Sequence, residues 1–580
     1  MSNLLSQASL VMIPSGYKED VVYSPIPTNG NGDLSFTRAS NGTRVNSAGL
    51  VEVVPWNLVT YSEEFNIGVW TIAQISVSAN TTTAPNGTTT ADTITTSSTG
   101  VCYIYQGFSL IGGVFTLSVY AKKGNNDFIA INNQSTSTNW VTAVFDLTDG
   151  TFGEYAVGSG GGFTYISNNI ESVGNGWYRC SLVFSGVTNN TTYPSIMFAP
   201  SKTGNTFTSS YGETSGNASG KTLFIWGAQL NIGSTAKPYF PTTDRLNVPR
   251  LTYQNGGGGC PSLLLEKQST NLCVESNVFN TSPWVSGSQS GTNPVITPNY
   301  GISPDGTQNA VRIELARQNV ITSYSQIYQY PIAITSGQPY TWSVYLKSLS
   351  GTPTISIIGD FGRPPVTLTS EWVRYTGTYT AGASQTQLEL AILGSNYATG
   401  NSLSADFLAY GYQIEQSSYP TSYIPTTSSS ATRVADDCSK TGISSLIGGG
   451  VGTWFMDFEM IQTTGSGNPF AFDLSDGSTA NRLFLYWGES TQSWNWGGAD
   501  TAITLPSTLR KKVAVKYSSG TGKLFCNGSL ISTLSLNTAW DRLDIGQRFS
   551  NQYPMDGKIN QAYFLTTSLT DAECQAITTI

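Results

Sequence analysis

The sequence predicts an all-β protein made of tandem, jelly-roll-like β-sandwiches, and three observations predict this class. Apolar and polar residues alternate along many short segments, with the period of two that is typical of half-buried strands. Long stripes with the 3.6-residue period of amphipathic helices are nearly missing. The third observation is an internal repeat, in which two long segments carry the same landmarks in the same order.

The repeat is clearest where each copy begins. Asn57-Leu-Val-Thr-Tyr-Ser is followed by Trp70, and Asn271-Leu-Cys-Val-Glu-Ser is followed by Trp284 at the same spacing. The other matched pieces, in chain order, are 115–122 with 340–347, Trp177 with Trp372, 227–230 with 411–414, and 239–243 with 423–427. Because the tryptophans recur at matched positions, we assign them to packing. The two copies are therefore expected to fold as sandwiches with one strand order.

The last part of the chain has its own pattern. Alternating residues predict strands over 454–460, 482–488, 512–517 and 557–565. Asn527-Gly528 lies between two strand-like runs and predicts a hairpin turn, because both residues tolerate a positive φ. Thr570 and Glu573 have the spacing of a capping box and predict the start of one short helix.

These patterns divide the chain into four predicted parts. They are an N-terminal segment (1–35), a first β-sandwich (36–250), a second, repeated β-sandwich (251–434) and a C-terminal sandwich (435–580). A Thr-Arg-Val element recurs at Thr43 and at Thr432, and we interpret it as a joint between modules.

Composition excludes several classes of function. Only 11% of the 580 residues are charged and the net charge is −8, so no basic footprint for nucleic acid is expected. Histidine is absent, which removes Ser-His-Asp catalysis and imidazole metal sites. No apolar run approaches the length of a membrane span, and the start of the chain is a poor signal peptide, so membrane insertion is not expected. The seven cysteines never form C-x-x-C, and they are expected to be reduced and mostly structural.

The C-terminal motifs resemble a known fold family. Lys523-Leu-Phe-Cys-Asn-Gly, Leu543-Asp-Ile-Gly, Gly557-Lys-Ile and Leu569-Thr-Asp-Ala-Glu are similar to the closing half of a laminin-G or concanavalin-A-like lectin sandwich. The resemblance covers about the last quarter of the chain. It implies a C-terminal concanavalin-A-like domain.

The doubled module resembles the carbohydrate-binding-module type of sandwich on the fibres and spikes of tailed bacteriophages. The stretch from Leu34-Ser-Phe-Thr-Arg-Ala-Ser to Ser62 is similar to the lead-in of such proteins, with a head fibre of a crAss-like phage as a concrete candidate. The resemblance implies a homotrimer on the virion surface, assembled in the host cytoplasm. It implies attachment to capsid or tail proteins through residues 1–35, and binding to host surface polysaccharide.

An enzymatic role would have to rest on carboxylates. Asp457 and Glu459 share one strand face, but the E-x-D-x-x-E pattern of concanavalin-like glucanases fails here at both glutamates. No catalytic residue is therefore assigned. Asp473 and Asp476 offer oxygen ligands of the kind that Ca²⁺ prefers, yet Asp and Gly beside Ser also make turns, so no metal ligand and no cofactor is assigned.

One aromatic cluster is a candidate carbohydrate site. Trp487, Trp494 and Trp496 lie around a polar loop, and Trp494 and Trp496 point to the same face of an extended strand. We predict an exposed platform on which sugar rings stack, with burial against the second sheet as the competing interpretation. The sequence favours a non-enzymatic virion surface fibre, head or tail. The alternatives are a tailspike-like polysaccharide depolymerase and a purely structural capsid decoration protein.

Overall fold

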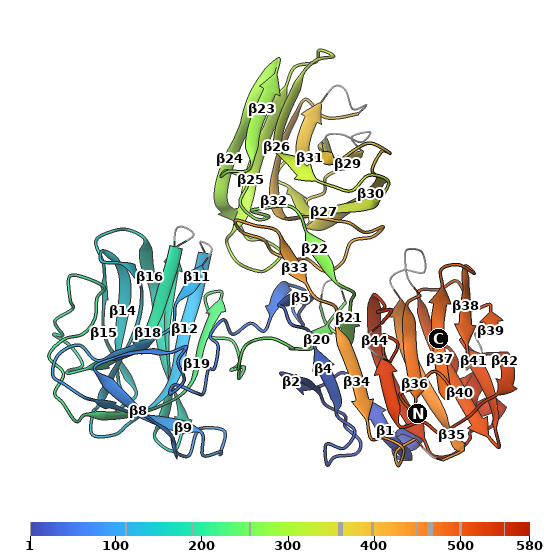
Figure 1. The fold of residues 1–580 in the computed structure, drawn as a ribbon. Helices are drawn as coiled ribbons and strands as arrows, with labels where there is room; N and C mark the ends of the chain where they lie inside the picture. Colours follow the sequence, from blue (N-terminus) through green and yellow to red (C-terminus); the bar gives the residue numbers. More distant parts are fainter. Residues whose placement is uncertain are drawn as a thin grey trace. The chain divides into compact units, whose positions relative to one another are not determined.

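The computed structural model describes residues 2–110, 113–186, 190–254, 257–357, 364–395, 400–447, 449–460, 468–497, 501–549 and 552–580. Over these residues the fold is nearly all β, as predicted, with two short helices, α1 (Ser2–Leu5) and α2 (Asp571–Thr578) (Figure 1). Two compact units divide the chain. One contains residues 55–245 with 306–309, and the other contains 1–54, 246–305 and 310–580.

The first sandwich has two antiparallel sheets that enclose one apolar core. One sheet has the order β15-β14-β13-β18-β10-β7, with β11 also on β18, and the other has the order β16-β17-β12-β19-β9-β8. The strands are β7 (Thr71–Ala73), β8 (Ile75–Thr82), β9 (Ala91–Thr96), β10 (Tyr103–Tyr105), β11 (Phe108–Leu110), β12 (Gly113–Lys123), β13 (Phe128–Thr136), β14 (Asn139–Asp146), β15 (Thr151–Val157), β16 (Phe163–Gly174), β17 (Trp177–Gly186), β18 (Asn190–Ala199) and β19 (Thr222–Ile232).

The second sandwich repeats this strand order. Its sheets are β23-β26-β31-β28-β29 and β24-β25-β32-β27-β30, which match the first copy once β11, β15 and β16 are set aside. The prediction of one shared topology is confirmed. The strands are β23 (Val285–Gln289), β24 (Gly291–Gly301), β25 (Ala310–Arg317), β26 (Tyr324–Ala333), β27 (Pro339–Ser348), β28 (Thr354–Ile357), β29 (Pro365–Thr367), β30 (Val373–Thr380), β31 (Gln387–Ser395) and β32 (Ser404–Glu415).

The residues that recur in the sequence make equivalent hydrogen bonds in the two copies. Asn57 Nδ2 donates to the carbonyls of Ala228 and Phe240, and Asn271 Nδ2 donates to those of Tyr412 and Ile424. In each copy the asparagine lies before the first strand and satisfies carbonyls that the sheets leave open, as buried polar groups require. Trp70 and Trp284 are both buried, and each indole donates to a carbonyl of the opening segment.

The C-terminal sandwich is larger than predicted. Its sheets are β20-β21-β44-β35-β40-β41-β42, with β1 also on β44, and β2-β3-β4-β34-β43-β36-β37-β38-β39. The strands are β1 (Ala8–Met12), β2 (Tyr17–Lys18), β3 (Val21–Val22), β4 (Leu34–Thr37), β20 (Arg250–Thr252), β21 (Ser262–Leu265), β34 (Asp437–Thr441), β35 (Val451–Met460), β36 (Phe470–Ser475), β37 (Arg482–Gly488), β38 (Ser493–Trp496), β39 (Thr501–Ile503), β40 (Arg510–Ser518), β41 (Thr521–Cys526), β42 (Ser529–Ser535), β43 (Arg542–Ile545) and β44 (Gly557–Leu565).

The expectation that residues 1–35 form a separate attachment segment is therefore corrected. β1 pairs with β44, and β4 pairs with β34, so this segment is part of both sheets of the C-terminal sandwich. The physical reason is burial: Leu10, Met12 and Leu34 are at most 2% exposed in that core. The second sandwich also begins later than the predicted residue 251. The strands β20 and β21, which end at Leu265, belong to a sheet of the C-terminal sandwich.

Two local predictions are confirmed. Asn527 and Gly528 both have a positive φ and join β41 to β42, as a type I′ turn requires. Thr570 caps α2, and its side chain and that of Glu573 exchange the hydrogen bonds of a capping box. Both signals are local in sequence, which is why they could be predicted.

Three arginines and two acidic residues form a buried cluster in the larger unit. Arg38 and Arg250 both contact Asp436, and Arg250 and Arg433 both contact Glu266. All five side chains are at most 2% exposed. Arg433 belongs to the second Thr-Arg-Val element and lies on β33 (Ala431–Arg433), which pairs with β22 (Ser269–Asn271). Arg44 of the first element lies on β5 (Gly42–Val45), opposite β6 (Val51–Val54), and instead pairs with Glu52.

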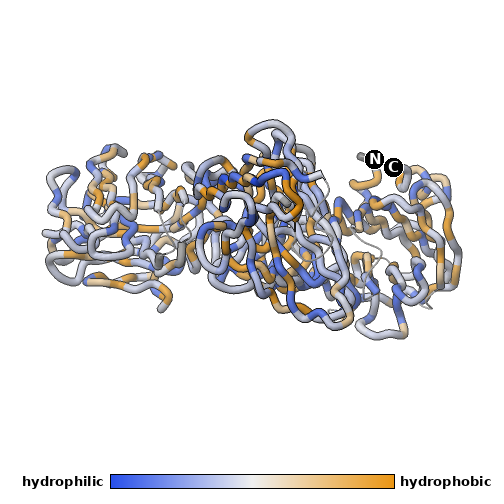
Figure 2. Tube along the Cα trace, turned by 90° about the horizontal axis from the view of Figure 1, so that it is seen from above, coloured by the Kyte–Doolittle hydropathy of each residue, from blue (hydrophilic) through white to orange (hydrophobic). Residues whose placement is uncertain are grey.

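Hydrophobic residues occur in short runs along the whole trace, interrupted by polar ones (Figure 2). This is the pattern of strands that bury one face. Among the described residues, no helix has the length and hydropathy that crossing a membrane requires.

Candidate functional site

The structure places the predicted tryptophan cluster in the core. Trp494 and Trp496 are 3% and 0% exposed, and Trp487 is half-buried against the same core. The two do share a face, as the spacing predicted, but it is the inner face of the nine-stranded sheet, where Trp494 contacts Phe458 and Trp487 edge-on. β38 lies between β37 and β39, so its inward side chains have the second sheet opposite them. The prediction of an exposed platform is therefore wrong, and Trp494 and Trp496 are buried against the second sheet, as the competing interpretation had it.

The two carboxylates considered for catalysis lie on β35 in different environments. Asp457 is buried, and both of its oxygens accept from the guanidinium of Arg510, at 2.9 and 2.7 Å. Asn560 Nδ2 also donates to Asp457, at 2.8 Å, and Ser262 Oγ donates to Asn560 Oδ1, at 2.6 Å. The bond to Asp457 raises the pKa of Arg510. This chain of bonds fixes four side chains from four strands, β21, β44, β35 and β40.

Asn560 owes its position to a β-bulge in β44. Asp457 lies opposite Gln561 and Phe458 lies opposite Ile559, so Asn560 is the extra residue. A bulge bends the strand and redirects the side chain at the extra position. Here it brings the amide of Asn560 between Ser262 and Asp457.

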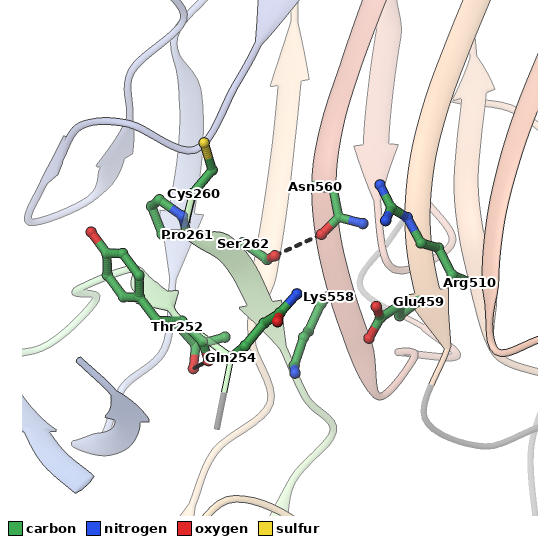
Figure 3. A pocket seen from close by; sticks show the side chains of 10 residues that line it. Thr252, Gln254, Cys260, Pro261, Ser262, Glu459, Arg510, Lys558 and Asn560 are labelled. Carbon is green, nitrogen blue, oxygen red and sulfur yellow. Dashed lines mark hydrogen bonds between the residues drawn. The ribbon is translucent and has the colours of Figure 1, made fainter. Parts of the chain in front are cut away.

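A cavity of about 390 Å³ opens beside this network, near the lower end of the range for small-molecule sites. Figure 3 shows Lys558, Glu459 and Arg510 extending from neighbouring strands, with Gln254 facing them. The lining residues are Thr252, Tyr253, Gln254, Cys260, Pro261, Ser262, Glu459, Arg510, Lys558 and Asn560.

Several groups that line this pocket are free to bind a ligand. Glu459 and Lys558 lie opposite each other in the ladder. Neither side chain makes a hydrogen bond or ion pair with any residue that the structure describes, and the same holds for Gln254. The pocket thus offers a fixed set of hydrogen-bonding groups together with a free ammonium, a free carboxylate and a free amide. Tyr253 adds one half-buried aromatic ring.

This combination suits a polyhydroxylated ligand. Hydroxyls both donate and accept, so they can satisfy Lys558 and Glu459 together, and the apolar face of a sugar ring can pack on Tyr253. Sequence reasoning missed Gln254, Ser262, Lys558 and Asn560. They come from segments about 300 residues apart, so no local spacing could have joined them.

The aspartates considered for calcium are otherwise engaged. Asp473 is buried and accepts two bonds from Arg482, at 3.2 and 2.6 Å. Asp476 accepts from the Ser478 backbone and from Asn481. Among the described residues, no group of three or more Cys, Asp or Glu side chains is placed to hold a metal ion. Six of the seven cysteines are buried free thiols, and Cys260, at the pocket, is exposed.

Residues 450–575 match the model of the concanavalin A-like lectin/glucanases superfamily. No curated protein matches the sequence. Among solved structures, the chain is similar to the CBM40 module of a Ruminococcus gnavus IT-sialidase bound to α2,3 sialyllactose, at 19% identity over 23% of this chain and 84% of that one, with a TM-score of 0.18.

Two further solved structures are similar at lower identity. The tandem CBM22 domains of Paenibacillus barcinonensis Xyn10C match at 11% identity over 62% of this chain and 97% of that one (TM-score 0.22). Domains LG4–5 of the mouse laminin α1 chain match at 10% identity over 44% and 93% (TM-score 0.15). TM-scores this low carry no argument, so the assignment of the C-terminal fold rests on the family match and on the sheet topology. The chain therefore carries a laminin-G/concanavalin-A-like lectin domain that includes residues 450–575.

Proposed function

We propose that this protein is a non-enzymatic surface fibre of a bacteriophage virion that binds host surface polysaccharide through the pocket beside β21, β44 and β35. The observation that carries glycan binding is the free Lys558 and Glu459 pair beside the fixed Ser262–Asn560–Asp457–Arg510 network, in a lectin-family domain. The virion location rests on the sequence resemblance of residues 34–62 and of the doubled module.

The way in which the carboxylates are held supports the proposal of binding without cleavage. Glycoside hydrolysis generally needs one carboxyl group that donates a proton and a second that acts as base or nucleophile. Both oxygens of Asp457 are occupied by Arg510, so Glu459 is left as the free carboxylate of the pair. A depolymerase at this site would lack one of its two groups.

The mode of attachment is revised by the fold. The strands β1 to β4, within residues 8–37, belong to the C-terminal sandwich, so attachment to capsid or tail proteins would use the surface of a folded domain. The homotrimer stays a prediction, and light scattering of the purified full-length chain at micromolar concentration tests it. A monomer there would contradict it.

The function is tested by incubating the full-length protein with purified host capsular polysaccharide. We expect the protein to co-sediment with the polysaccharide and to release no reducing ends. Release of reducing ends that is lost in Asp457→Asn or Glu459→Gln would instead show a depolymerase. Absence of co-sedimentation would favour a structural decoration protein.

A further inference from the structure

Three charged side chains that line the pocket form a row across three neighbouring strands. Lys558 lies opposite Glu459 in the ladder of β44 and β35, and Glu459 lies opposite Arg510 in the ladder of β35 and β40. Phe458 and Ile559, the sequence neighbours of Glu459 and Lys558, point into the core, so the row lies on the outer face of the sheet. The order of charges along the row is therefore positive, negative, positive.

The charges of this row are not paired with one another. Residues directly opposite each other in antiparallel strands are close enough to interact, but Arg510 turns toward Asn560 (Figure 3) and bonds to Asp457. Lys558 and Glu459 are half-buried, and neither makes an ion pair or hydrogen bond with a residue that the structure describes. A half-buried charge has lost part of its hydration, and a ligand that supplies the complementary group replaces what was lost.

The free hydrogen-bonding groups of the pocket include more charged donors than charged acceptors. The guanidinium of Arg510 bonds to Asp457 through Nε and Nη2, so its Nη1 group has no partner among the described residues. Lys558 adds a free ammonium. Both oxygens of Asp457 are occupied, and among the lining residues only Glu459 offers a carboxylate. This excess of cationic donors favours a ligand that carries an anionic acceptor.

We propose that the pocket selects acidic sugars and that its ligand is a hexuronic acid residue. The sugar carboxylate accepts from Lys558 and from Nη1 of Arg510, and the ring hydroxyls donate to Glu459. In a hexuronic acid the carboxylate and the hydroxyls are on different carbons of one ring, so a single residue can meet all three side chains. The proposal rests on the proposed glycan-binding function of this pocket and adds the charge of the sugar.

Isothermal titration calorimetry of the full-length protein tests the preference for acids. The probes are hexagalacturonate and hexamannuronate, each compared with its fully methyl-esterified form, which keeps the ring and its hydroxyls and loses the charge. We expect at least one acid to bind, and its ester to bind at least about tenfold more weakly. Raising NaCl from about 50 to about 300 mM should narrow that difference, because salt screens the ion pair. A hexaglutamate peptide offers carboxylates without ring hydroxyls and should bind at least about tenfold more weakly than the acid sugar.

Substitution of Lys558 tests which group reads the charge. Lys558→Gln should bind the acid and the ester with similar affinity, because the amide donates hydrogen bonds but carries no charge. Lys558→Arg keeps the charge and should keep the preference for the acid. Lys440→Gln, at a half-exposed lysine of the same sandwich outside the pocket, is the matched control and should leave the preference unchanged.

The proposal is refuted if neither acid binds, if acid and ester bind the wild type equally, or if Lys558→Gln keeps the preference. Equally tight binding of hexaglutamate would overturn the assignment to a sugar. The salt dependence in the wild type keeps the test decisive if Lys558→Gln fails to fold. Equal binding of acid and ester that is lost in Lys558→Ala/Glu459→Ala would leave the glycan-binding pocket standing without its preference for acids. The proposed function fails as well if no hexamer binds and host polysaccharide does not co-sediment with the protein.

Discussion

Leu10 of β1 lies opposite Phe564 of β44, so strands from the first dozen residues and from the last two dozen share one ladder. Both side chains are at most 2% exposed in the core of the C-terminal sandwich. The C-terminal sandwich is therefore assembled from segments before, between and after the two repeated sandwiches, with β20 and β21 as the segment between them.

Deletion of residues 1–35 should unfold or strongly destabilise the C-terminal sandwich. It removes β1 and the strands β2 and β3, and burial of each large apolar side chain contributes about 1.5–3 kcal/mol. Thermal unfolding followed by circular dichroism checks this. A deletion variant that keeps the wild-type unfolding profile would show that the segment is dispensable. That result would favour the original prediction that residues 1–35 form a separate attachment segment.

Asp436→Asn should lower the free energy of unfolding by about 3–5 kcal/mol, because Arg38 and Arg250 would be left buried with less counter-charge. Glu314→Gln is the control: Glu314 pairs with Arg312 at the surface, and loss of such a pair changes stability by about 0–1 kcal/mol. Denaturant unfolding of the larger unit measures both. Equal effects would mean that the buried cluster contributes no more than a surface pair.

Stability should fall as pH rises from about 4 to about 6. Burial raises the pKa of Asp556 to about 6, and burial does the same for Asp544. An unfolded aspartate has a pKa of about 3.9, so the folded protein holds more protons in this window and stability declines as pH rises through it. Asp556 accepts from Tyr419 and from the Lys267 N–H, and Lys267 and Glu266 are the charged groups that act on it.

Asp556→Asn should flatten that decline, since the amide does not titrate and can still accept from Lys267. Melting temperatures of the wild type and the variant between pH 4 and pH 7 check the prediction. An unchanged slope of melting temperature against pH in the variant would show that groups other than Asp556 cause the pH dependence. Below pH 4 an opposite trend is expected, because the neighbouring arginines Arg433 and Arg250 hold the pKa of Glu266 at about 2 against the effect of its burial.

Trp496→Ala should cost about 3–5 kcal/mol, the range for a large aromatic side chain removed from a core. Tyr253→Ala, at the rim of the pocket, should change stability by no more than about 0.5 kcal/mol. Urea unfolding compares them. A Trp496→Ala protein as stable as the wild type would contradict the burial of Trp494 and Trp496 and favour the exposed platform.

Much of the fold could be predicted because its signals are local. The Asn57 and Asn271 motifs, the Asn527-Gly528 turn and the Thr570 cap each act within a few residues or recur at fixed spacing. Residues 1–35 gave no such signal, since β1 to β4 are two to five residues long, and β1 and β4 pair with β44 and β34, which are far away in sequence.

The site could not be predicted for a related reason. The i and i+2 spacing of Trp494 and Trp496 establishes that they share a face, and the following Gly497 suggested an open edge, but only the pairing of β38 shows that the face is inward. Lys558 and Glu459 become neighbours only through the ladder of β35 and β44. Their chemistry is visible in the sequence, and their proximity is not.

The most direct test of the account is surface plasmon resonance of the full-length protein on immobilised host capsular polysaccharide, with Lys558→Ala/Glu459→Ala compared with the wild type. Lys440→Ala, a half-exposed lysine of the same sandwich outside the pocket, is the matched control. We predict that the double variant loses at least about tenfold in affinity, or about 1.4 kcal/mol, while Lys440→Ala binds as the wild type does. A double variant that stays folded and binds with unchanged affinity would contradict the assignment of this pocket as the glycan site.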